Sequence, residues 1–114
     1  VVIHKKHYSI YAFDLNDNVL TNLVLYSKKI AHKLDHFFDD VGRTALVFEG
    51  FGVDHVHAKL FPMHGTKLIH ENWQPIKSSI DKYFHEYEGY ISSHDFKRED
   101  DIKLALLAEE IRNF

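Results

Sequence analysis

An alternation of polar and apolar side chains in the middle of the chain is its clearest pattern. The alternating residues are, in order, Asp54, His55, Val56, His57, Ala58, Lys59, Leu60, Phe61 and Pro62. A period of two predicts a β-strand whose apolar side chains pack on a core. Successive side chains on one face of a strand lie about 6.6–7 Å apart. The pattern therefore predicts two imidazoles and an ammonium group in a row on the open face.

Apolar residues at helical spacing predict a long amphipathic helix before this strand. Asn16 or Asp17 can cap its start, because either side chain accepts hydrogen bonds from backbone N–H groups of the first turn. The segment Asp39–Gly42 ends it. The apolar positions of this helix are Leu20, Leu23, Val24, Ile30, Ala31, Leu34, Phe37 and Phe38.

The apolar run Thr44–Glu49 predicts a central strand, and the turn Glu49–Gly52 leads from it into the histidine strand. Because few residues separate the two strands, we expect them to pair antiparallel. Val1–Ile3 is short and β-branched, which indicates the end of another strand. The predicted fold class is α+β, with a mainly antiparallel sheet and a long helix packed on it.

The second half of the chain carries weaker patterns. We expect a loop over 63–75, a short helix over 77–84, a strand over 87–91 and a last helix that Glu99 or Asp100 opens. Residues 1–66 would form the core, and residues 67–114 a C-terminal extension packed on it within the same domain. The chain begins inside an apolar run without a methionine, so we expect an N-terminal segment before Val1.

The composition narrows the class of protein. A chain of 114 residues that is 45% hydrophobic can bury one compact core. Its formal net charge of −3 argues against a nucleic-acid or membrane-surface binder and favours a small-molecule partner. The chain has no cysteine, which excludes disulfides and thiolate metal sites and fits a reducing cytoplasm.

The row of His55, His57 and Lys59 fits a phosphate site. A neutral imidazole is a good nucleophile near pH 7, because its reference pKa is about 6.5. His57, in the middle of the row, could attack phosphorus and form a phosphoramidate that water later cleaves. Lys59 is placed to stabilise the charge on the phosphate oxygens.

Two other interpretations of the row stay open at this point. A single histidine on a strand is more often structural or solvated than catalytic. A His-x-His pair can also bring two imidazoles to one Zn²⁺, with His64 as a third ligand. The ammonium of Lys59 would repel a cation, which favours the phosphate site. We therefore predict no metal and no cofactor.

The row resembles the signature of the histidine triad (HIT) superfamily, His-φ-His-φ-His-φ-φ with φ apolar, in a divergent form that reads His-x-His-x-Lys. Upstream, the segment 2–7 (Val-Ile-His-Lys-Lys-His) resembles the family's Val-Ile-Pro-Lys-x-His segment. The segment 46–50 (Leu-Val-Phe-Glu-Gly) resembles its Asn-Glu-Gly-type strand and turn. The resemblance covers about residues 1–65 and implies that the core, residues 1–66, is HIT-like. It implies a HIT-like fold, a homodimer with a sheet running across both subunits, and activity without an obligatory metal.

The resemblance also implies a role for each matching residue. His57 matches the nucleophile that attacks the α-phosphate, His55 the histidine that orients it, and His7 the upstream histidine that supports the site. Lys59 stands where the signature has its third histidine, so it joins the catalytic set. The expected substrate-binding residues are Lys59, His64 and Gly52.

The expected function is therefore a HIT-like nucleotide phosphohydrolase or nucleotidyl transferase that acts through a nucleotidyl-histidine intermediate. Its expected substrate is a purine nucleotide or a dinucleoside polyphosphate, with no nucleic-acid or membrane partner. The alternative is a nucleotide-binding protein with little catalysis, because Lys59 replaces a histidine and the connection from Glu49 to His55 is short.

Overall fold

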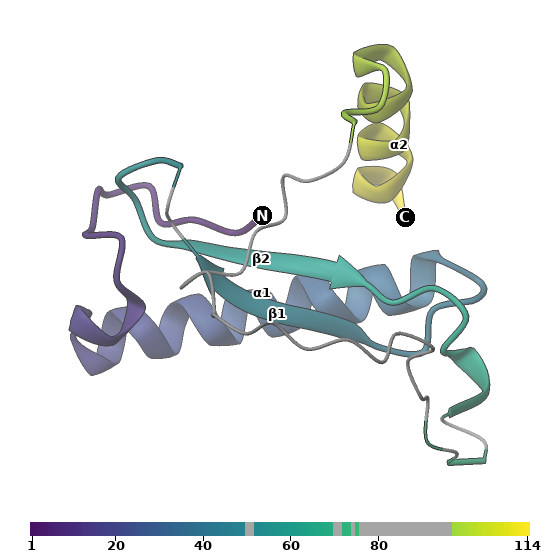
Figure 1. Ribbon diagram of the computed structural model, residues 1–114, viewed down its shortest axis with the longest axis horizontal. Helices are drawn as coiled ribbons and strands as arrows, with labels where there is room; N and C mark the ends of the chain where they lie inside the picture. Colours follow the sequence, from purple (N-terminus) through teal and green to yellow (C-terminus); the bar gives the residue numbers. More distant parts are fainter. Residues whose placement is uncertain (50–51, 70–71, 74, 76–96) are drawn as a thin grey trace, which may run out of the picture. The chain divides into compact units, whose positions relative to one another are not determined.

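The computed structural model describes residues 1–49, 52–69, 72–73, 75 and 97–114. The chain divides into two compact units, residues 1–73 with Phe114 and residues 74–113, and each is described by itself. The described elements in chain order are η1 (Ala12–Asp14), α1 (Asp17–Phe37), β1 (Thr44–Glu49), β2 (His57–Pro62), η2 (Lys67–Ile69) and α2 (Asp101–Asn113) (Figure 1).

The long helix α1 confirms the prediction for this segment. Asn16 is its N-cap, and the side-chain oxygen of Asn16 accepts a hydrogen bond of 3.0 Å from the backbone N–H of Val19. At the other end the N–H of Phe38 still donates to the carbonyl of Leu34, at 3.2 Å. The cap satisfies one of the N–H groups that a helix start leaves without a partner, so a local feature of the sequence determines where α1 begins.

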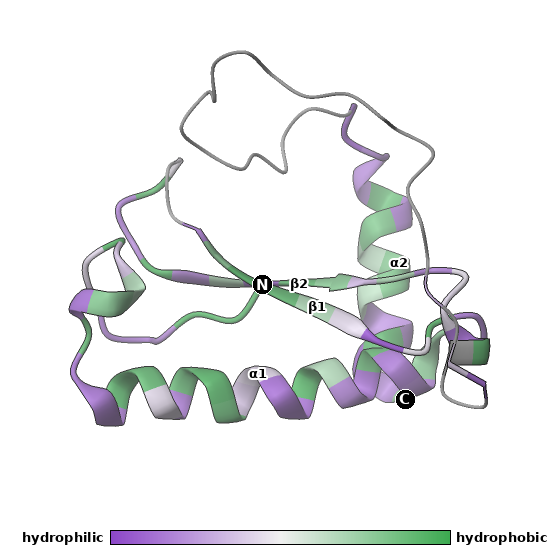
Figure 2. Ribbon diagram, turned by 60° about the horizontal axis from the view of Figure 1, so that its bottom comes forward, coloured by the Kyte–Doolittle hydropathy of each residue, from purple (hydrophilic) through white to green (hydrophobic). Residues whose placement is uncertain are grey.

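The strands β1 and β2 pair antiparallel, from Thr44 opposite Pro62 to Glu49 opposite His57. Val2 extends the sheet at the other edge of β2 through an isolated bridge to Ala58, with N–H···O distances of 2.8 and 3.0 Å. Figure 2 shows α1 lying along one side of the two strands. The predicted α+β class, with an antiparallel pair and a helix on one face, is therefore confirmed.

The histidine strand is shorter than predicted. It begins at His57, and His55 lies in a bend before it. The described residues 52–56 form no ladder with β1, and the pairing begins where His57 lies opposite Glu49. The backbone instead turns tightly, and the N–H of His55 donates to the carbonyl of Val53 at 2.7 Å.

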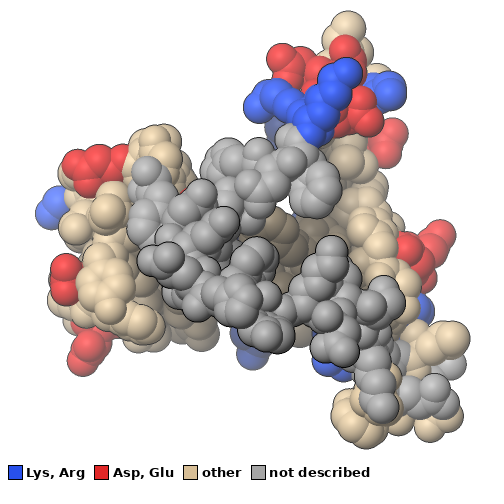
Figure 3. All heavy atoms as spheres, in the orientation of Figure 1, with Lys and Arg blue, Asp and Glu red and all other residues tan. Residues whose placement is uncertain are grey.

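The helix α2 begins where one of the two predicted caps places it. The carboxylate of Asp100 accepts hydrogen bonds from the N–H groups of Ile102 and Lys103, at 3.0 and 3.2 Å. Figure 3 shows basic and acidic side chains intermingled over α2, where Arg98 pairs with Asp101 at 2.7 Å. Within the ranges that the structure describes, no helix is long and apolar enough to cross a membrane.

The predictions for residues 63–96 have mixed outcomes. The expected loop over 63–75 contains a short helical turn, η2. The helix predicted over 77–84 and the strand predicted over 87–91 lie outside the described residues.

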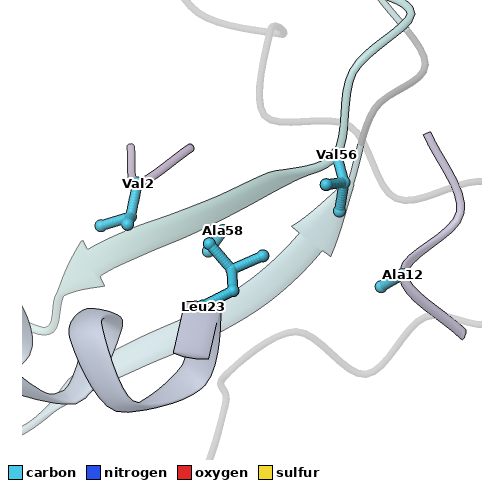
Figure 4. Packing of buried hydrophobic residues seen from close by; sticks show 5 residues of the cluster. All are labelled: Val2, Ala12, Leu23, Val56 and Ala58. Atoms are coloured by element: carbon cyan, nitrogen blue, oxygen red, sulfur yellow. The ribbon is translucent and has the colours of Figure 1, made fainter. Parts of the chain in front are cut away.

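The core of the first unit lies between α1 and the sheet. Its buried side chains are those of Val2, Ala12, Leu23, Val56 and Ala58 (Figure 4). Leu23 comes from α1 and is 2% exposed, while Val56 and Ala58 are fully buried. Because side chains alternate along a strand, burying Val56 and Ala58 toward the helix directs His57 and Lys59 to the opposite face.

Candidate functional site: a row of three histidines

Three imidazoles from two separate segments meet beside the start of β2. The rings of His7 and His55 are stacked, with centroids 5.4 Å apart and an interplanar angle of 27°. The rings of His55 and His57 meet edge to face at 6.0 Å. The structure therefore brings together the three histidines that the sequence pattern selects, His7 from the N-terminal segment and two from the β2 region.

His55 is held in one orientation by the N-terminal segment. Its Nδ1 accepts the backbone N–H of Tyr8 at 3.4 Å, and its Nε2 lies 3.1 Å from the carbonyl of His4. Since Nδ1 is the acceptor, the ring proton resides on Nε2 and is donated to His4. His4 is in turn anchored to α1, because its Nε2 lies 3.1 Å from the carbonyl of Val19. The bridge at Val2 and these bonds together fix the segment that carries His7.

His57 carries the least satisfied polar atom of the row. The residue is half-buried and stands directly opposite Glu49 in the ladder. Its Nδ1 is buried, and it has no hydrogen-bond partner within the described part of the chain. Leaving a buried polar atom without a partner costs about 1–3 kcal/mol. Such atoms in a native structure call for an explanation, and a ligand or catalytic role is one.

Lys59 has a partner that the sequence analysis did not foresee. Its Nζ forms an ion pair with the carboxylate of Glu49, and the two side chains are only 14% and 8% exposed. The carboxylate offsets the charge that was expected to hold a phosphate. Glu49 could have been noticed, because an acidic residue ends an otherwise apolar strand, but only the register places it diagonally across from Lys59.

His7 forms the exposed end of the row. Its Nε2 lies 3.9 Å from a carboxylate oxygen of Asp54, and both side chains are largely exposed. The neighbouring Lys5 and Lys6 are exposed too, and the Lys6 ammonium lies 5.6 Å from the centre of the Tyr8 ring. Positive charge beside the row thus comes from the N-terminal segment as well as from β2.

The other two predicted binding residues add no side chain to the row: His64 lies away from it, and Gly52 has no side chain. His64 follows Pro62, at the opposite end of β2 from His57. Its Nδ1 lies 2.9 Å from Asp40, a hydrogen bond that, together with the N–H of Gly65, lowers the pKa of Asp40 below its ordinary value of 3.8. Gly52 is exposed, and a Cβ added to it would meet open space.

The length of β2 also separates His64 from His55 and His57, the pair with which it would have to share a metal. Within the described ranges, no three His, Asp or Glu side chains are placed to hold a metal ion.

A cavity of about 440 Å³ lies on the β1 side of the sheet. It lies between η1 and β1, and Glu49 is one of its lining residues. Most of its other lining is apolar, including Tyr11, Phe13 and Leu46. Glu49, which is opposite His57 in the ladder and pairs with Lys59, is therefore the residue that this cavity shares with the surroundings of the row.

Comparison of the chain with protein-family models, with curated proteins and with solved structures finds no match. The assignment of a function therefore depends on the motif and on the geometry of the row.

Proposed function

We propose that the protein is a HIT-like nucleotide phosphohydrolase or nucleotidyl transferase with His57 as its nucleophile. The observation that supports this most is the convergence of His7, His55 and His57, with a buried nitrogen on His57 that has no hydrogen-bond partner among the described residues. The proposed substrate is a purine nucleotide derivative or a dinucleoside polyphosphate, and the proposed assembly is a homodimer.

The proposed reaction has two steps. A ring nitrogen of unprotonated His57 attacks the α-phosphorus, and the bond from phosphorus to the leaving group breaks with its electron pair on the leaving group. Water then attacks the phosphorus of the nucleotidyl-histidine, which releases the nucleotide and restores the imidazole. His55 supports the nucleophile by ring contact, and its own orientation is set by Tyr8 and His4.

A second candidate is a nucleotide-binding protein with little turnover. The ion pair between Lys59 and Glu49 favours it, because catalysis of phosphoryl transfer depends on positive charge that stabilises the transition state. A carboxylate beside the nucleophile opposes that stabilisation. Binding could still draw on Lys5 and Lys6.

The test compares the purified protein with His57→Ala and with the matched control His64→Ala, an exposed histidine at the other end of β2. The substrates are an adenosine 5′-phosphoramidate and a dinucleoside tetraphosphate. We expect His57→Ala to lower turnover by at least a thousandfold and His64→Ala to leave it within about twofold. Intact mass measurement after acid-free quenching should detect the adenylylated protein only where His57 is present. Undiminished turnover by His57→Ala would remove His57 from the mechanism.

Calorimetry with AMP separates the two candidates. Binding of AMP without turnover of either substrate supports the binding protein. Binding with turnover supports the enzyme, and absence of both would refute both candidates.

A further inference from the structure

A second cavity, of about 500 Å³, lies at the other end of the sheet from the histidine row. It is formed where the second half of α1 meets the connection into β1. Its lining includes Thr44 and the charged or imidazole side chains of Lys28, Asp35, His36, Arg43 and Lys67. Thr44 begins β1 and Glu49, opposite His57, ends it. A strand of this length spans roughly 16 Å, so the cavity is separate from the proposed active site.

The lining is strongly basic for a chain whose net charge is −3. It contains three permanent cations, Lys28, Arg43 and Lys67, and one acidic residue, Asp35. The carboxylate of Asp35 accepts a hydrogen bond of 2.7 Å from the hydroxyl of Thr44, which fixes it against the start of β1. The cavity therefore carries a formal charge of +2, three cations less one carboxylate, before its histidines are considered.

Hydrogen bonds join the two segments that carry Arg43 and Lys67, which are far apart in the sequence. The N–H of Gly42 donates to the Thr66 hydroxyl at 2.9 Å, and the N–H of Lys67 donates to the Asp40 carbonyl at 3.1 Å. The packing is close, since a Cβ on Gly42 would lie 2.2 Å from the Thr66 carbonyl oxygen. The carbonyl of Arg43 also accepts the N–H of Met63 at 3.0 Å. The backbone of Arg43 and Lys67 is thus positioned before any ligand arrives.

A hydrogen bond within α1 fixes one side chain of the cavity wall. The Nδ1 of His36 lies 2.6 Å from the carbonyl of His32, so Nδ1 carries a proton and donates it to that carbonyl. The orientation of the His36 ring is therefore set before any ligand arrives.

From this arrangement we infer that the cavity is a binding site for a phosphate or diphosphate group carried by a small molecule. Arg43 presents a planar fork that matches two phosphate oxygens, and Lys28 and Lys67 supply point charges. A volume near 500 Å³ lies within the range of small-molecule sites. The net negative charge of the whole chain disfavours a nucleic-acid backbone as the occupant.

The test uses inorganic pyrophosphate as the probe and the full chain at constant ionic strength. Amide chemical shifts are followed during titration of the unaltered protein, the double variant Arg43→Gln/Lys67→Gln, and His57→Ala. The control is Lys29→Gln, which removes the same charge from α1 at an exposed residue outside the lining of this cavity. Circular dichroism checks that each variant is folded.

The inference predicts saturable shifts at residues 28–36, 41–44 and 67. The double variant should bind pyrophosphate at least tenfold more weakly, whereas Lys29→Gln and His57→Ala should bind within about twofold of the unaltered protein. Lys67→Arg should retain most of the affinity, since the charge remains. Shifts that never saturate, shifts confined to the histidine row, or equal weakening by Lys29→Gln would each overturn the inference. Because His57→Ala is a separate arm, failure here leaves the proposed activity untouched.

Discussion

The buried ion pair of Lys59 and Glu49 makes a sharp prediction about stability. Lys59→Met removes the ammonium group but keeps a side chain of similar length. It leaves the Glu49 carboxylate behind in a position where its side chain is only 8% exposed. A buried charge that loses an ion-pair partner is costly, so we expect a loss of stability from this single change.

The magnitude follows from the burial. Two unit charges in contact attract by about 4–6 kcal/mol at an effective dielectric constant near 20, and desolvation of both groups cancels much of that gain. Removing one partner of a buried pair costs about 3–5 kcal/mol, because the remaining charge is uncompensated. Total stability of a domain is about 5–15 kcal/mol, so Lys59→Met should bring the fold close to unfolding at room temperature.

The assay is urea unfolding followed by far-UV circular dichroism, applied to a double-mutant cycle. The variants are Lys59→Met, Glu49→Gln and the two combined. We expect each single variant to lose about 3 kcal/mol or more, and the double variant to lose less than either, since a neutral pair leaves no buried charge. Lys5→Met serves as the control, because Lys5 is exposed, and it should change stability by less than about 0.5 kcal/mol.

Two results would refute this reasoning. A loss of less than about 1 kcal/mol for Lys59→Met would mean that water reaches the carboxylate. Additive losses in the double variant would mean that the two residues stabilise the fold independently of each other.

Two further predictions concern residues before β1 that contact the turn after β2: Gly42, which packs on Thr66, and Asp40, which pairs with His64. Gly42→Ala places a methyl group 2.2 Å from the Thr66 carbonyl oxygen, and since that atom belongs to the backbone, urea unfolding should show a loss of about 1–3 kcal/mol. Gly52→Ala, whose methyl group meets open space, should be close to neutral, and a comparable loss there would contradict the packing argument. The hydrogen bond from His64 lowers the pKa of Asp40 in the folded protein. The ionised carboxylate therefore stabilises the fold above about pH 4, and this stabilisation is lost as the pH falls through the lowered pKa of the folded state. Asp40→Asn should therefore reduce the loss of stability on acidification. An unchanged loss, in stability measurements from pH 2 to 6, would count against this role.

The helices and the first strand could be predicted because local features determine them. Asn16 caps α1 through the N–H of a residue three positions on, and Asp100 caps α2 in the same way. The run Thr44–Glu49 is apolar enough to form a strand wherever it packs. Each of these signals lies within a few residues of the structure it specifies, so pattern and spacing suffice.

The start of β2 could not be predicted in this way. The polar and apolar alternation continues upstream through His55, but the ladder of β2 with β1 begins at His57, opposite Glu49. Whether a residue belongs to a strand depends on a partner strand, and the partner's last residue is a property of the paired sheet.

The charged contacts of the site could not be predicted from the sequence either. The sequence by itself determined that His55, His57 and Lys59 follow one another at a spacing of two, and that His7 ends a basic segment. Only the tertiary structure decided that Glu49 neutralises Lys59 and that His64 turns to Asp40. The physical reason is that an ion pair depends on which side chains the register and the turns bring within reach. Residues ten or more positions apart in these contacts meet because the strands pair and the turns bring them together.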